Sequence, residues 1–234
     1  MKLGRLLVAL AAALALPSCL LTPGKFTSGL TINADRSFSF TYVGEVIAVD
    51  PSSEMKGMSS SETPAADATD EEKKAAANKK VEVAKASAEL ETKRRAMAEA
   101  LAKEAGYRSV RYQGNGKYLI DYAISGRLDH SFLFPFNSDA EVAIPFIALE
   151  VRKDGAVRIK APAFGKSAKP GGMDLPMGDS TSLAEGVFTV TTDAEIVMHN
   201  NEDGVKAVGG KKALVWHVTP LSKDAPVAVL RLKP

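Results

Sequence analysis

The chain has 234 residues and a formal net charge of +2, and 45% of its residues are hydrophobic. This length suits one medium domain or two small ones. The balanced charge argues against nucleic acid as a partner, because nucleic acid binding requires a concentrated basic face.

The first 19 residues are typical of a secretory signal that ends in a lipidation site. Two of the 30 basic residues, Lys2 and Arg5, precede an apolar run over 6–16, and no acidic residue lies within 1–18. A charged start, a short apolar segment and a small residue before the cut form a signal peptide. The ending Leu16-Pro17-Ser18-Cys19 resembles a bacterial lipobox, in which the cysteine is acylated.

We therefore expect residues 1–18 to be removed, Cys19 to carry lipid, and residues 19–26 to form a tether. A transmembrane helix is the less favoured alternative, because spanning a bilayer needs about 20 apolar residues. A cleaved signal that leaves Cys19 free is a second alternative. Lipidation places the chain in the cell envelope, attached to a membrane and facing the periplasm, and Leu20 after the cysteine favours the outer membrane.

The only cysteine is thereby assigned, so we expect no disulfide within the chain. The fold must then be stable on its hydrophobic core alone, although an envelope location permits disulfides. Removal of the signal leaves 28 basic and 28 acidic residues. The mature chain is therefore electrically neutral.

Alternating apolar residues predict two strands between 25 and 49. The alternation occurs on both sides of a turn at 33–36, and Leu30 and Phe40 belong to it. A period of two residues is typical of a half-buried sheet. The stretch 51–68 is rich in Ser, Met, Thr, Pro and Ala without periodicity, and we expect a flexible loop there.

A long helix is predicted over 69–105. Thr69 and Glu72 form a capping box, and Gly106 is a typical stop. Ala, Lys and Glu dominate the segment, and all three favour helix. The segment 71–80 has only alanines to bury, which leaves a solvated arm and a partner-binding arm as alternatives. The apolar residues at helical spacing, which we expect to pack on the sheet, are Val83, Ala86, Leu90, Met97 and Leu101.

The remainder of the chain predicts further strands. Hairpins are expected around Gly114–Gly116 and Asp154–Gly155, and a flexible loop over 165–182. Strands followed by one helix and more strands predict an α+β fold. We expect one domain over 27–234, an antiparallel β-sheet with one long helix packed on one face. The late strands are expected at 187–190, 195–198, 212–218 and 227–232.

The sequence contains none of the short motifs that mark common catalytic or metal sites. His130, His199 and His217 are scattered and lack metal-ligand spacing. No nucleophile elbow or phosphate-binding loop occurs. We therefore expect no catalytic residue, no metal and no cofactor, while an enzyme with a dispersed site remains an alternative.

Phenylalanines are concentrated over 132–146. Core packing is the ordinary role of such residues. The alternative is an apolar groove for an acyl chain or a hydrophobic peptide, because such pockets have few polar groups. The groove candidates are Phe132, Phe134, Phe136 and Phe146.

Most of the chain after Cys19 resembles uncharacterised lipoproteins of alphaproteobacteria. The resemblance is carried by "DYAISGRLDHSFLFPFNSDAEVAIPFIALEVRKDGAVRIKAPAF" at 121–164, by 189–232 and by the opening at 22–26. A weaker resemblance is to the LppM-like lipoprotein domain, through an early hairpin, a helix and a late strand with Trp216. It implies a lipid-anchored α+β domain that contacts envelope lipids.

We therefore expect a non-catalytic envelope lipoprotein that binds a hydrophobic ligand or envelope lipid. The alternatives are a scaffold that binds a partner protein through the 69–105 helix, and an enzyme whose site the sequence does not reveal. The expected attachment is to a membrane through Cys19, and nucleic acid is not an expected partner.

Overall fold

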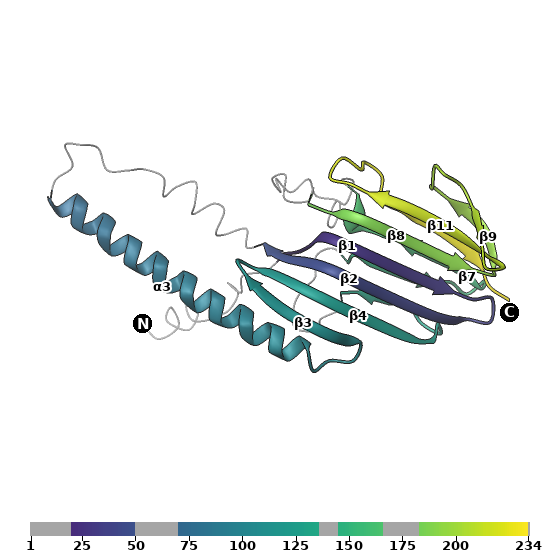
Figure 1. The fold of residues 1–234 in the computed structure, drawn as a ribbon, viewed down its shortest axis with the longest axis horizontal. Coiled ribbons are helices and arrows are strands. Elements are labelled where there is room, and N and C mark those ends of the chain that lie inside the picture. The colour runs from purple at the N-terminus through teal and green to yellow at the C-terminus, as the bar shows by residue number, and fades with distance from the viewer. Residues whose placement is uncertain (1–19, 50–69, 136–144, 166–182, 234) are drawn as a thin grey trace, which may run out of the picture.

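Two β-sheets face each other, and one long helix extends from one end of the pair (Figure 1). The computed structural model describes residues 20–49, 70–135, 145–165 and 183–233. The predicted signal peptide, Cys19, Thr69 and the predicted loop at 51–68 lie outside these residues, as does the loop at 165–182 beyond Gly165.

Sheet A has seven strands in the order β10-β11-β8-β1-β2-β4-β3, and sheet B has five in the order β5-β6-β7-β12-β9. The helix α3 spans Asp70–Leu101, and a short 3-10 turn spans Pro162–Phe164. The strands are β1 Leu20–Ile32, β2 Ser37–Val49, β3 Tyr107–Gly114, β4 Lys117–Arg127, β5 Phe132–Phe134, β6 Ile147–Val151, β7 Ala156–Lys160, β8 Glu185–Thr192, β9 Glu195–His199, β10 Lys206–Val208, β11 Lys211–Val218 and β12 Val227–Arg231.

The expectation of a β-rich chain with one long helix is confirmed, whereas its single antiparallel sheet is wrong in two respects. The strands form two sheets, and β8 lies parallel to β1 with Thr27 opposite Val187. Parallel neighbours need a long crossover. Here the chain between β1 and β8 includes β2, α3, β3, β4 and the first three strands of sheet B, so local periodicity cannot reveal the parallel pairing.

The core fills the space between the two sheets. Side chains two residues apart on β1 and β2 point inward, among them Leu30 and Tyr42, which are 1% and 0% exposed. Ile147 and Leu149 of β6 are equally buried on the facing sheet. This alternation matches the pleated geometry of a β-strand, in which every second side chain points to the same face.

The predicted tether over 19–26 is wrong for the residues that the structure describes, because β1 begins at Leu20 opposite Val49. In the fold the pairing shifts register between Pro23 and Phe26, and β8 joins only from Lys25 onward. A proline is tolerated at such an edge and next to a bulge.

Helix α3 packs on the β3–β4 hairpin only through its last third. Ala98 is 6% exposed, and the hydroxyl of Tyr118 donates to the backbone oxygen of Arg94. The helix stops before Gly106, whose φ of +92° is the left-handed conformation that glycine adopts easily. The predicted helix is confirmed, but it ends at Leu101, before the predicted end at Ala105.

The two ends of the sandwich differ in their connections. We name the end at which β1 begins the anchor end, because residue 20 follows Cys19 directly. At the opposite end short turns join neighbouring strands, including the predicted turns at 33–36 and 154–155. Figure 1 shows the C-terminus at that opposite end.

Candidate functional site

The predicted groove residues fill the core in the part of the chain that the structure describes. Phe134 and Phe146 are 2% and 0% exposed, and Phe132 is half-buried. The ring of Phe134 lies 4.6 Å from that of Tyr122 and 5.2 Å from that of Tyr42. These three phenylalanines therefore pack as core and leave no groove between them. Phe136 lies outside the described residues.

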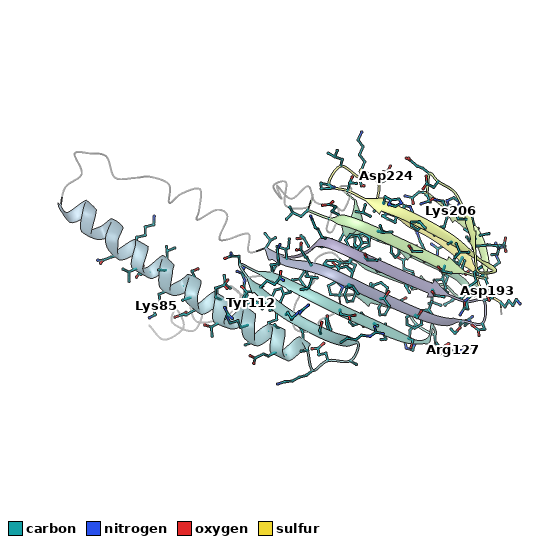
Figure 2. The ribbon with its side chains drawn as sticks, viewed as in Figure 1. Lys85, Tyr112, Arg127, Asp193, Lys206 and Asp224 are labelled. Carbon is teal, nitrogen blue, oxygen red and sulfur yellow. The ribbon has the colours of Figure 1, made fainter. Side chains whose placement is uncertain are left out.

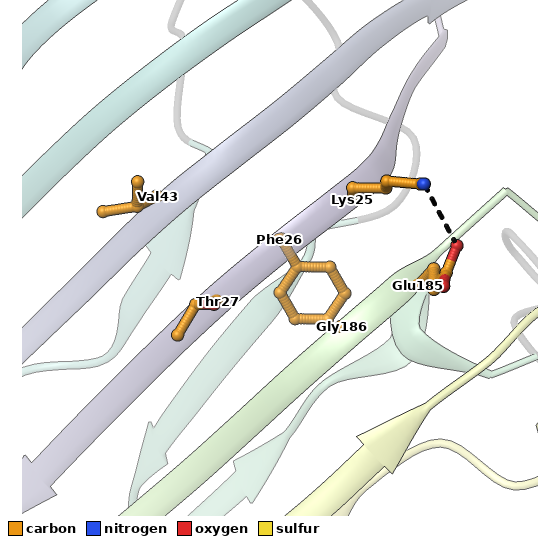
Figure 3. Close-up of a pocket in the computed structure, with 6 residues that line it drawn as sticks. All are labelled: Lys25, Phe26, Thr27, Val43, Glu185 and Gly186. Atoms are coloured by element: carbon orange, nitrogen blue, oxygen red, sulfur yellow. Dashed lines mark ion pairs between the residues drawn. The ribbon is translucent and has the colours of Figure 1, made fainter.

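A shallow depression of about 340 Å³ lies over the middle of β1 and the start of β8 (Figure 3). Lys25 and Glu185 flank it, and the Nζ atom of Lys25 lies 3.9 Å from a carboxylate oxygen of Glu185. Both side chains are more than half exposed, so this ion pair contributes little. An open surface depression with one weak pair does not resemble a ligand pocket, which buries most of its ligand.

The three histidines are not brought together. His130 and His217 are exposed, and the Nδ1 atom of His199 accepts a hydrogen bond of 3.2 Å from the backbone of Asn201. Among the described residues no cluster of three or more histidine, cysteine and acidic side chains is suited to a metal ion.

The most connected polar cluster fastens α3 to the β3–β4 hairpin. The hydroxyl of Tyr112 donates to Glu91 at 2.6 Å and accepts from the backbone N–H of Gly116 at 2.9 Å. Arg94 donates to Glu91 at 3.2 Å and to the backbone oxygen of Ala48 at 3.4 Å. We name Glu91, Arg94 and Tyr112 the docking cluster. It joins the helix to the end of β2.

The docking cluster perturbs its own ionisable groups. The hydrogen bond from Tyr112, followed by the neighbouring Arg94, holds the pKa of Glu91 below its ordinary value. Burial and the bond to Glu91 raise the pKa of Tyr112. The Nε atom of Arg94 is buried without a hydrogen-bond partner. These pKa shifts favour an ionised Glu91 and a neutral Tyr112. In these states the tyrosine hydroxyl donates to the carboxylate and holds the helix on the hairpin.

The N-terminal part of α3 extends past the anchor end. Every described side chain from Asn78 to Glu89 is exposed, with Val81 at 68% and Val83 at 53%. Figure 2 shows Lys85 on this part and Tyr112 where the helix meets β3. We name residues 70–89 the arm. A helix of 20 residues is about 30 Å long, so the arm offers a long surface that the sandwich does not cover.

Sequence reasoning identified the helix but missed the docking cluster. The predicted packed stripe is wrong at its N-terminal end, because Val83 and Ala86 are exposed beyond the edge of the sandwich. The stripe residues Leu90 and Met97 mark the packed face. Arg94 lies on that same face and would have been the available signal. Ala48, to which Arg94 donates, and Tyr112, which donates to Glu91, are distant in sequence, and only the strand pairing brings them near.

None of the helices in the described residues combines the length and hydropathy that crossing a bilayer requires.

Comparisons with known proteins give only weak structural likeness. No family model matches the chain, and no curated protein matches it. The NMR structure of the folded domain of Mycobacterium tuberculosis LppM aligns with a TM-score of 0.38 at 14% identity, covering 92% of this chain and 93% of that chain. At this level the likeness supports neither fold nor function. The resemblance to alphaproteobacterial lipoproteins stays a prediction.

Proposed function

We propose that this chain is a bacterial envelope lipoprotein, anchored through Cys19, whose non-catalytic domain holds a partner protein on the arm of α3. The observation that carries the proposal is the arm itself. Its described side chains are exposed on all sides, and it leaves the sandwich at the end next to the anchor.

The anchor part of the proposal is supported by the signal layout and by the position of β1. The strand begins one residue after Cys19. Each buried acyl CH₂ contributes about 0.8 kcal/mol to membrane binding, so two or three acyl chains would hold the domain permanently at a membrane.

The partner part is supported by the energetics of an unpacked helix. Helices in proteins are stabilised mainly by packing one face on a core. The arm lacks such packing in the described residues between Asn78 and Glu89. A helix that is polar on most sides suits a bridge between domains or proteins.

The arm also presents one face suited to another helix. Val81, Ala84 and Ala88 follow the three- and four-residue spacing that places side chains on one side of a helix. Small side chains on that face permit close approach. We therefore propose a helical segment of a second envelope protein as the partner, in place of a hydrophobic ligand in a phenylalanine groove.

Site-specific crosslinking in living cells tests the partner. A photoreactive amino acid at Val81 is expected to give an adduct, whereas the same group at Val208, exposed near the opposite end, is expected to give none. Ala84→Arg should remove the Val81 adduct because it lies on the same face. Ala86→Arg should preserve the Val81 adduct, because Ala86 lies roughly 200° around the helix from Ala84.

The same adduct from both crosslinker positions would contradict the proposal, as would an adduct that survives Ala84→Arg. Circular dichroism of each variant verifies that the helix has formed.

A further inference from the structure

Two exposed leucines lie at the anchor end in addition to the start of β1. Because β8 runs parallel to β1, Leu183, just before β8, is at that end. Strand β11 ends with Val218 opposite Gly186, so the turn Thr219–Ser222 follows at the same end. Figure 2 labels Asp224, which belongs to this connection. Topology therefore places these leucines at the same end of the sandwich as Leu20, the residue that follows Cys19.

Leu221 is held outward by a hydrogen-bonded turn. The backbone N–H of Ser222 donates to the backbone oxygen of Thr219 at 2.9 Å. The Ser222 hydroxyl accepts from the N–H of Thr219 at 3.0 Å, and the Thr219 hydroxyl accepts from the N–H of Leu221 at 3.3 Å. Pro220 fits the second turn position, where its fixed φ is favourable.

The side chain at the third position of this turn is unusually exposed for its type. Leu221 is 79% exposed, the highest value among the exposed large hydrophobic side chains of the described residues. Gly, Asn, Asp and Ser are the usual choices in turns. The second leucine, Leu183, is 46% exposed. A single exposed leucine is ordinary on a protein surface, so the location of this pair carries the argument.

We infer that the anchor end rests on a lipid bilayer, with Leu221 and Leu183 in its interfacial layer as a second attachment beside the lipid on Cys19. The inference rests on the proposed anchoring. Leu20 is already paired with Val49, and one residue spans at most about 3.6 Å. The strand end therefore stays within a residue or two of the headgroups, close enough for neighbouring side chains to touch them.

Tryptophan fluorescence in vesicles tests the inference with the full, acylated protein. The single tryptophan, Trp216, is first replaced by Phe, and one reporter is introduced per variant as Leu221→Trp or Leu183→Trp. Val208→Trp is the matched control, 58% exposed near the opposite end. The vesicles contain phosphatidylethanolamine and phosphatidylglycerol, with or without phosphatidylcholine brominated near the headgroup end of its acyl chains.

The expected result is a loss of emission from the reporters at 221 and 183 when brominated lipid is present, with a shift to shorter wavelength, and neither effect at 208. Equal emission with and without brominated lipid for all three reporters would overturn the inference. Mass spectrometry of each sample separates the acylation of Cys19 from the contact of the two leucines with the bilayer. An acylated protein without quenching leaves the anchor intact, whereas an unacylated Cys19 overturns both the anchor and the inference.

Discussion

At the scale of single residues, the docking cluster decides where α3 lies. Tyr112 bridges a helix carboxylate and a hairpin backbone N–H through one hydroxyl, and Arg94 reaches the backbone of β2. Hydrogen bonds to charged groups are stronger than hydrogen bonds between neutral groups. Three side chains thereby tie the helix to two strands at the anchor end.

Replacement of Glu91 tests this role through pH. Because the folded pKa of Glu91 lies below its unfolded value, its contribution is present above the unfolded pKa and is lost as pH falls through the folded pKa. Glu91→Gln should lower the free energy of unfolding by about 1 kcal/mol at neutral pH. In urea titrations the difference from the native sequence should vanish in acid.

The matched control for that titration is Glu195→Gln. Glu195 pairs with Arg231 at 3.0 Å, but both side chains are 59% exposed, so the change should be within about 0.5 kcal/mol. A Glu91→Gln deficit that stays constant across pH would argue against an ionised glutamate at the docking cluster.

Glycine at position 44 is required by a close strand approach. An added Cβ would lie 2.6 Å from the Cβ of Phe26 and 2.5 Å from the backbone oxygen of Lys25. Gly44→Ala should therefore destabilise the fold by about 1–3 kcal/mol, as overpacking does. At Gly126 the nearest atom would be 3.8 Å away, and Gly126→Ala should be nearly neutral. Chemical denaturation measures both, and equal effects would be inconsistent with the strand register.

At the scale of elements, local signals predicted most strands, the helix and several turns. The hairpins at 114–116 and 154–155 were found because glycine turns separate alternating runs. Gly114, Gly116 and Gly155 in these turns all have a positive φ. The division into two sheets was not found. The parallel β1–β8 pair joins residues about 160 apart in sequence, such as Lys25 and Glu185, and periodicity does not record such pairing. The start of β1 is paired with the end of β2, Leu20 with Val49, which local periodicity does not record either.

The phenylalanine cluster shows the same limit for the candidate site. Its composition fitted both a core and a groove, and only the facing sheet decided between them. Phe134→Ala should lower the free energy of unfolding by about 3–5 kcal/mol. Its neighbour Leu133 is 44% exposed, so Leu133→Ala should cost far less. Urea unfolding of both variants checks this, and a stable Phe134→Ala protein would revive the groove.

The arm should open independently of global unfolding, whereas the packed third of α3 should unfold together with the sandwich. Glycine in a helix interior costs about 1 kcal/mol relative to alanine. Ala84→Gly should speed hydrogen exchange along the arm and leave global stability unchanged, because Ala84 contacts no core. Ala98→Gly should lower global stability, since Ala98 is buried against the sheet. A global loss with Ala84→Gly would mean that the arm is coupled to the core.

At the scale of the whole molecule, the two ends have different tasks. One end is closed by short turns and holds the C-terminus, while the other collects the start of β1, the departing arm and two exposed leucines. The proposed lipid on Cys19 would set the second end against a membrane. The partner surface and the leucine contact both follow from that placement.

The most direct test of this account is the mass of the N-terminal peptide from protein isolated from bacterial membranes. The account predicts a chain that begins at Cys19 with a diacylglycerol on its sulfur, and a Cys19→Ser variant that is neither acylated nor cut before residue 19. A native N-terminal peptide with an unmodified Cys19, or acyl groups that persist on the Cys19→Ser variant, would contradict it.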